Sequence, residues 1–307
     1  MEKGARVPAA PFVVVVAAAV VSSGPVQAGP AVGERGRPIE VDVPTLIALS
    51  AVAWALVDVL HEIVGHAGAA VLLGVPVRAV STTTAYLAWD QVQTVGDART
   101  IDAAATVLNL VTGGLALLAL RSRRVTNPAS RYFLWIFATF SLTVVTVNLL
   151  AGGDWTEVIR GLEPRGLWRA GIVAVGMLVA VAGYILPLKL WMPDLHEDRR
   201  LQLKVTAIPV VVFIVVQTLS VAWSPFARQP WGSGQNALAS VVAISFILGL
   251  WLALVNLVQR PRSTKPVESI QMTRSNIWLA VGLIVFLLFV TVLGPGLGPL
   301  EDDPRLT

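Results

Sequence analysis

The stretch Asp58-Val-Leu-His61-Glu62-Ile-Val-Gly65-His66 places two histidines and two carboxylates inside a run of otherwise apolar residues. It holds two of only three histidines in a chain of 307 residues. Ionisable side chains at membrane depth cost roughly 2.5–3.5 kcal/mol each in insertion measurements, and they usually mark function. Four of them in so short a stretch indicate a functional site.

The composition is that of a membrane protein with several spans. The chain is 55% hydrophobic and only 14% charged, whereas about a quarter of the residues of a soluble domain are charged. A helix of about 20 apolar residues crosses the hydrocarbon core. We therefore predict an all-α polytopic membrane protein, embedded in the lipid bilayer of a bacterial cell membrane. Its transmembrane helices, about seven in number, are expected at residues 44–73, 101–120, 132–152, 168–190, 205–223, 237–258 and 277–296.

The N-terminus and the loop charges leave the orientation open. Residues 1–28 have a basic start, an apolar run and a small-residue site, which fit either a cleaved signal peptide or an extra span. A Gly/Pro-rich linker follows at 29–42. The distribution of Lys and Arg over the loops places the start of the first span in the cytoplasm, whereas a cleaved signal peptide predicts the reverse. The net charge of +4 concerns orientation and indicates no nucleic-acid partner.

Residues 75–89 separate the first two apolar segments and differ from both. They are rich in β-branched residues and turn signals. This pattern predicts a short strand or a small β-hairpin at the membrane surface, and an ordinary extended loop is the alternative.

The spacing of the histidines indicates a metal site with one extra residue. The chain has no cysteine, so a metal would need His, Asp or Glu ligands. In the common zinc-protease helix two histidines four residues apart bind the metal, and the adjacent glutamate polarises a water. His61 and His66 are five apart, which on an ideal α-helix separates them by about 140°. Joint ligation therefore requires a π-bulge, and Gly65 is the residue most able to permit one. Gly68 is expected to let another helix approach closely.

Two known families share parts of this pattern. His61-Glu62-Ile-Val-Gly65-His66 resembles the His-Glu-x-x-Gly-His signature of a family of soluble zinc dipeptidyl-peptidases, in which both histidines bind zinc. Residues 44–157 resemble the site-2 protease family of intramembrane zinc metalloproteases. That likeness rests on the order of the His-Glu motif, the predicted hairpin, an Ala/Gly-rich span with Asn109, and a span that ends in Asn148-Leu-Leu-Ala-Gly-Gly-Asp154.

The resemblance to site-2 proteases implies a role for each matching residue. His61, His66 and Asp154 would bind Zn²⁺, and Glu62 would be the catalytic general base. Asn109 and Asn148 would orient the substrate or the backbone. The chain departs from the family by the extra residue between the histidines and by lacking the Pro and Asp-Gly elements around Asp154. It would then comprise an N-terminal segment and linker at 1–42, a metalloprotease-like membrane core at 43–160 and an additional four-helix membrane region at 161–307.

Alternatives remain open for several of these residues. Glu157, one helical turn after Asp154, is the rival third ligand. Asp58 lies one turn before His61, where it would either accept the free ring N–H of a ligand histidine or pair with an arginine. Asn109 and Asn148 are otherwise explained by hydrogen bonds between neighbouring helices.

Two functions of different classes follow from this cluster. The first is a zinc-dependent intramembrane metallopeptidase, a hydrolase that cleaves a membrane-protein or peptide substrate in or near the bilayer. The second is a transporter or proton-conducting membrane protein that uses the same buried His/Glu/Asp cluster without hydrolysis. A pseudoenzyme that keeps the fold and binds a partner is a third interpretation.

Overall fold

The computed structural model describes residues 41–122, 124–191, 199–224, 242–245, 247, 249 and 272–298. The predicted targeting segment at 1–28 lies outside these residues, as do most of the linker and of the predicted span at 237–258.

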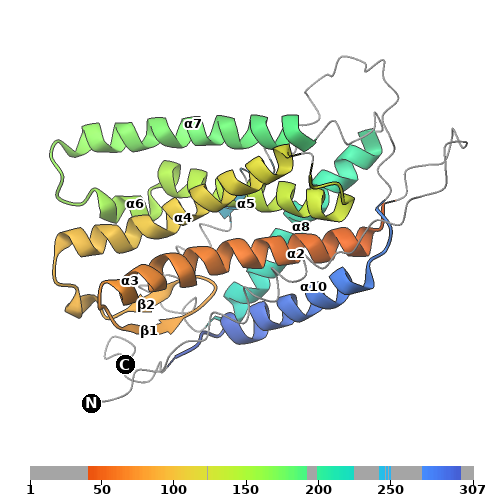
Figure 1. Cartoon of the computed structure of the whole chain (residues 1–307). Helices are drawn as coiled ribbons and strands as arrows, with labels where there is room; N and C mark the ends of the chain where they lie inside the picture. Colours follow the sequence, from red (N-terminus) through yellow and green to blue (C-terminus); the bar gives the residue numbers. More distant parts are fainter. Residues whose placement is uncertain are drawn as a thin grey trace, which may run out of the picture.

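The described chain is mostly helical, and six of its helices are long and apolar enough to cross a membrane. This confirms the polytopic helical class. The six candidate spans correspond to the predicted segments within the described ranges. In Figure 1 most of them run roughly in one direction, and α8 crosses the bundle at an angle. Their helices are α2 (Val43–Val59) continued by η1 (Leu60–Ala67) and α3 (Gly68–Leu72), α4 (Val95–Arg121), α5 (Pro128–Ala151), α7 (Arg165–Trp191), α8 (Arg199–Trp223), and α10 (Asn276–Leu288) continued by η5 (Phe289–Leu293).

Polar caps at the helix starts explain where several spans begin. The Asp42 side chain accepts a hydrogen bond from the backbone N–H of Thr45 at the start of α2. Thr94 and Asp97 form a reciprocal capping box at the start of α4. Asn127 and Ser275 cap α5 and α10 in the same way as Asp42 caps α2. Such caps satisfy backbone N–H groups that have no partner inside the helix.

The helix α2 lies at the centre of the bundle. It packs against α5, α8 and α10, and η1 at its C-terminal end packs against α4. Small residues let the helices approach: a Cβ on Gly282 of α10 would lie 2.6 Å from the Cβ of Ala48 in α2. Because these helices are apolar on most sides, van der Waals packing at small residues replaces the hydrophobic effect as their source of association.

The predicted hairpin is present between α3 and α4. Strand β1 (Val77–Val80) pairs antiparallel with β2 (Ala85–Leu87), and both strands pack against η1. In Figure 1 the hairpin lies beside α3 at the end of the bundle. A 3₁₀ turn, η2 (Trp89–Gln91), leads from β2 toward α4.

The π-bulge predicted from the histidine spacing is confirmed. Leu60–Ala67 forms a π-helix in which the backbone N–H of Gly68 donates to the carbonyl of Ile63, five residues earlier. Hydrogen bonds of this span bring residues five apart to nearly the same side of the helix. The widened turn therefore turns His61 and His66 toward one another, and their ring centroids lie 5.0 Å apart.

The close approach to another helix that was expected at Gly68 occurs at Gly65. A Cβ on Gly65 would lie 2.4 Å from the Cα of Ala105, so Gly65 is where η1 meets the backbone of α4. A Cβ on Gly68 would meet nothing closer than the carbonyl oxygen of Ile63 in its own helix, at 3.6 Å. The prediction of a close helix approach at Gly68 is thus wrong, because the side of the turn that faces α4 carries Gly65.

We predict that Gly65→Ala destabilises the protein by about 1–3 kcal/mol, since the added methyl group forces two packed backbones apart. The matched variant Gly68→Ala stays within about 1 kcal/mol of wild type, because alanine has the better helix propensity and meets no neighbouring helix. Thermal unfolding in detergent measures the difference. Equal melting temperatures for the two variants would contradict this account of the contact between η1 and α4.

Candidate metal centre

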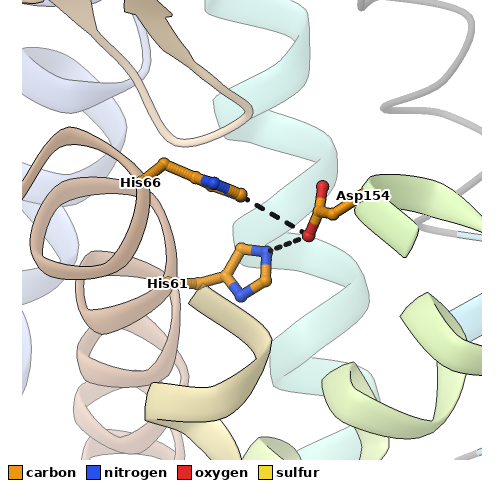
Figure 2. Close-up of side chains that lie close together, drawn as sticks. All are labelled: His61, His66 and Asp154. Atoms are coloured by element: carbon orange, nitrogen blue, oxygen red, sulfur yellow. Dashed lines mark ion pairs between the residues drawn. The ribbon is translucent and has the colours of Figure 1, made fainter. Parts of the chain in front are cut away.

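Three side chains from distant parts of the chain converge at one point. The Nε2 atoms of His61 and His66 lie 3.4 and 3.5 Å from Oδ2 of Asp154. Figure 2 shows the histidines reaching in from one side and Asp154 from the opposite side. The three potential ligand atoms lie within 4.8 Å of one another. Both histidines are more than nine-tenths buried, and the Asp154 side chain is 23% exposed.

The spacing of these atoms fits a small tetrahedral metal ion. Zinc bonds of 2.0–2.1 Å place neighbouring ligand atoms about 3.3 Å apart, close to the two histidine–aspartate distances. Oδ2 of Asp154 is buried and has no hydrogen-bond partner among the described residues, although both imidazole nitrogens are near it. The three atoms thus lie close enough together to share one ion. Three protein ligands with an open fourth position is the arrangement of catalytic zinc sites.

The backbone of α4 fixes the ring of His66. Its Nδ1 donates a hydrogen bond to the backbone carbonyl of Ile101 in α4, at 3.0 Å. A neutral imidazole that donates from Nδ1 leaves the Nε2 lone pair free, and this is the usual outer contact of a ligand histidine.

His61 is oriented by Asn109 of α4. The amide nitrogen of Asn109 lies 3.2 Å from Nδ1 of His61, and Oδ1 of the same amide is buried without a hydrogen-bond partner among the described residues. A half-turn rotation of the amide exchanges these two atoms. The oxygen then accepts the Nδ1 proton of His61, and Nε2 keeps its lone pair for a metal. Asn109 is fully buried, so no solvent competes for this contact.

A glycine turn brings Asp154 to the histidines. The helix α5 ends at Ala151, and the chain reverses at Gly152 (φ +114°) and Gly153 (φ +30°) into the short helix α6 (Gly153–Val158). Both φ values lie in the region that favours glycine. Arg169 of α7 donates to the carbonyls of Leu149 and Leu150 and so caps the C-terminal end of α5.

The carboxyl group of Asp154 is in the anionic form that binds cations. Burial alone would raise the pKa of this carboxyl, but the adjacent side chains of His61 and His66 outweigh burial and hold the pKa well below the usual range of an aspartate. The rival ligand Glu157 forms an ion pair with Arg160 on the exposed side of α6. The structure therefore directs Asp154, and not Glu157, toward the histidines.

Glu62 lies beside the three converging residues. It interacts electrostatically with His61, His66 and Asp154, and strand β2 packs against η1, the segment that carries Glu62. Glu62 is half-buried. It lies next to the potential ligands without being one of the converging three.

The structure places the remaining predicted residues differently. Asp58 was expected to accept the free ring N–H of a histidine. The Nδ1 atoms of His66 and His61 instead contact the Ile101 carbonyl and the Asn109 side chain. Asp58 interacts electrostatically with Glu62. Asn148 bonds to the carbonyl of Val144 in its own helix, and its Oδ1 packs against Gly153, so it supports the turn before Asp154.

Two charged residues near the site were missed from the sequence. Asp102 of α4 is buried and interacts electrostatically with His66 and Asp154. Arg169 holds the end of α5, as described above. Both lie within about a turn of the start of a predicted apolar span. Ionisable residues in such spans usually mark functional sites, so the argument used for Asp58 and Glu62 also applies to them.

Comparisons with protein-family models, with curated proteins and with solved structures found no match for this chain.

We predict that Asp154→Asn lowers zinc affinity by more than about 100-fold. Asp154 would itself be a ligand, and losing a residue that only hydrogen-bonds to a ligand already costs about 10–100-fold in affinity. Glu157→Gln, three residues later, leaves the affinity unchanged because Glu157 faces Arg160. Zinc content and competition with a chelator, measured on detergent-purified protein, decide between them. Loss of zinc in Glu157→Gln and not in Asp154→Asn would reverse the assignment of the third ligand.

We predict that Asn109→Leu weakens zinc binding by about 10- to 100-fold, since His61 loses the partner that orients its ring. The matched variant Thr112→Val removes a hydroxyl that bonds within α4 and should bind zinc as wild type does. Isothermal titration of the apoprotein gives both affinities. Equal affinities would show that Asn109 acts only in helix packing.

Proposed function

We propose that the protein is a zinc-dependent intramembrane metallopeptidase that hydrolyses a peptide bond in or near the bilayer. The observation that carries this proposal is the convergence of His61, His66 and Asp154, with Glu62 at their side, inside helices long enough to span a membrane. A zinc ion held by the three residues would supply a polarised water as the nucleophile at neutral pH.

Glu62 would move the proton in this reaction. Its carboxylate takes a proton from the attacking water as the new C–O bond forms at the peptide carbonyl carbon. It then passes that proton to the leaving nitrogen as the C–N bond breaks, which yields a carboxylate and an amine.

Helix α6, which carries Asp154, lies outside the candidate spans, and none of its residues is fully buried. We therefore expect water to reach the site from the side of α6. Strand β2 pairs with β1 and with no further strand among the described residues. An extended peptide would add as a further strand along the outer edge of β2, which is a common mode of peptide recognition. A peptide segment is therefore the substrate class that this site favours.

We predict that Glu62→Gln lowers cleavage by at least about 100-fold, the usual contribution of a general base, while zinc content stays at that of wild type. A fluorescently labelled library of single-span peptides, incubated with the protein in proteoliposomes, measures cleavage. Glu157→Gln serves as the carboxylate control and should cleave normally. Cleavage by Glu62→Gln at the wild-type rate would contradict the proposal. So would ion transport that persists after zinc chelation in a wild-type protein that cleaves nothing.

A further inference from the structure

The first half of the turn between β1 and β2 is buried. Ser81 and Thr82 are each only 1% exposed, whereas Thr83 and Thr84 are half-buried. Hairpin turns usually lie at the surface because their backbone groups need water. Here the backbone groups must find partners in the protein, and the partners come from helices far along the chain.

Gln217 of α8 is the polar side chain that reaches the tip. Its Nε2 donates to the carbonyl of Thr82 at 3.3 Å, and its Oε1 accepts a hydrogen bond from Nε1 of Trp54 at 3.0 Å. The indole of Trp54 is in turn fixed between the rings of Phe140 and Phe213. Gln217 is itself more than nine-tenths buried, so both contacts are made without competition from solvent.

The C-terminal end of the described chain holds the same hairpin. The N–H of Thr82 donates to the carbonyl of Leu293, the last residue of η5. Leu297 then pairs with Val80 through two backbone hydrogen bonds, of 2.9 and 2.8 Å. This pairing covers the outer edge of β1 and leaves the outer edge of β2 as the one without a partner strand among the described residues.

Strand β2 lies next to the candidate site. It packs against η1, the segment that carries Glu62 and both histidines. A shift of the hairpin would therefore move the strand beside Glu62 and the edge on which an extended peptide would lie. The hairpin has only one short β-ladder of its own, and an isolated two-stranded hairpin is marginally stable at best.

We infer that Gln217, together with the pairing of Leu297 to Val80, holds the hairpin as a fixed platform beside Glu62, which makes Gln217 a positioning residue of the peptidase. The inference rests on the proposed function for its consequence in catalysis, but the anchoring of the hairpin can be measured without it. The opposite model is a hairpin that moves away from Glu62 to admit the substrate.

The first experiment compares Gln217→Leu with Ser220→Ala. Ser220 lies one turn further along α8, is fully buried and bonds only within its helix. Gln217→Leu should accelerate hydrogen exchange of the amides at 82–87 about tenfold, the effect of losing one buried hydrogen bond. Zinc content stays constant, and cleavage falls about tenfold through KM, because the edge that receives the peptide is less ordered. Ser220→Ala should change none of these. Unchanged exchange at 82–87 in Gln217→Leu overturns the inference.

The second experiment locks the hairpin and uses the absence of native cysteine. Val80 and Leu297 form a hydrogen-bonded antiparallel pair, whose Cα atoms lie about 5.5 Å apart, within the range of a disulfide. The double variant Val80→Cys/Leu297→Cys, oxidised, should cleave as fast as its reduced form. Added to Gln217→Leu, it should restore cleavage. If oxidation abolishes cleavage reversibly, the hairpin has to open, and the platform model is wrong.

These readouts separate the two proposals. A wild-type protein that cleaves no peptide would contradict the proposed peptidase function. Hydrogen exchange at 82–87 would still decide whether Gln217 anchors the hairpin. Normal cleavage with unaltered exchange in Gln217→Leu would support the peptidase function and show that Gln217 has no positioning role in it.

Discussion

The contact between Gly65 and Ala105 is the constraint on which the candidate site depends. It lets the π-helical turn η1 press against the backbone of α4. Ile101, Ala105 and Asn109 lie four residues apart on α4 and so form one stripe along that helix. The two outer members of the stripe contact Nδ1 of His66 and of His61. A single close approach therefore sets the orientation of both histidine rings, and any displacement of η1 from α4 would disturb both at once.

The opposite side of the site depends on how α5 ends. Two glycines with positive φ reverse the chain, Arg169 of α7 caps the exposed carbonyls, and Asp154 then enters from the first turn of α6. The carboxylate and the histidines thus come from separate packed units, η1 with α4 and α5 with α7. Because these units already hold the three side chains close together, a metal ion would bind here with little further cost in conformational entropy.

The later helices have a role that a minimal His-Glu core would not reveal. The helix α7 supplies the cap for α5, α8 supplies Gln217, and the chain after η5 closes the edge of β1. Each of these contacts acts on an element that carries a site residue or touches one. The hairpin is thus held by partners that come from late in the chain, through Gln217 of α8 and the residues that follow η5.

The sequence alone determined the class of protein, because apolar length is a local pattern. From β-branched residues between turns it predicted a short strand or hairpin, with an extended loop as the alternative. It predicted the π-bulge only on the condition that His61 and His66 bind one metal. It also named His61, His66 and Asp154 together, by resemblance. Only the tertiary structure decided that Asp154 and not Glu157 faces the histidines, that Asn109 and the Ile101 carbonyl take the place expected of Asp58, and that Gly65 rather than Gly68 meets another helix. Those outcomes depend on which side of each helix meets its neighbour, and hydrophobic spans that are apolar all round carry no periodicity from which that side could be read.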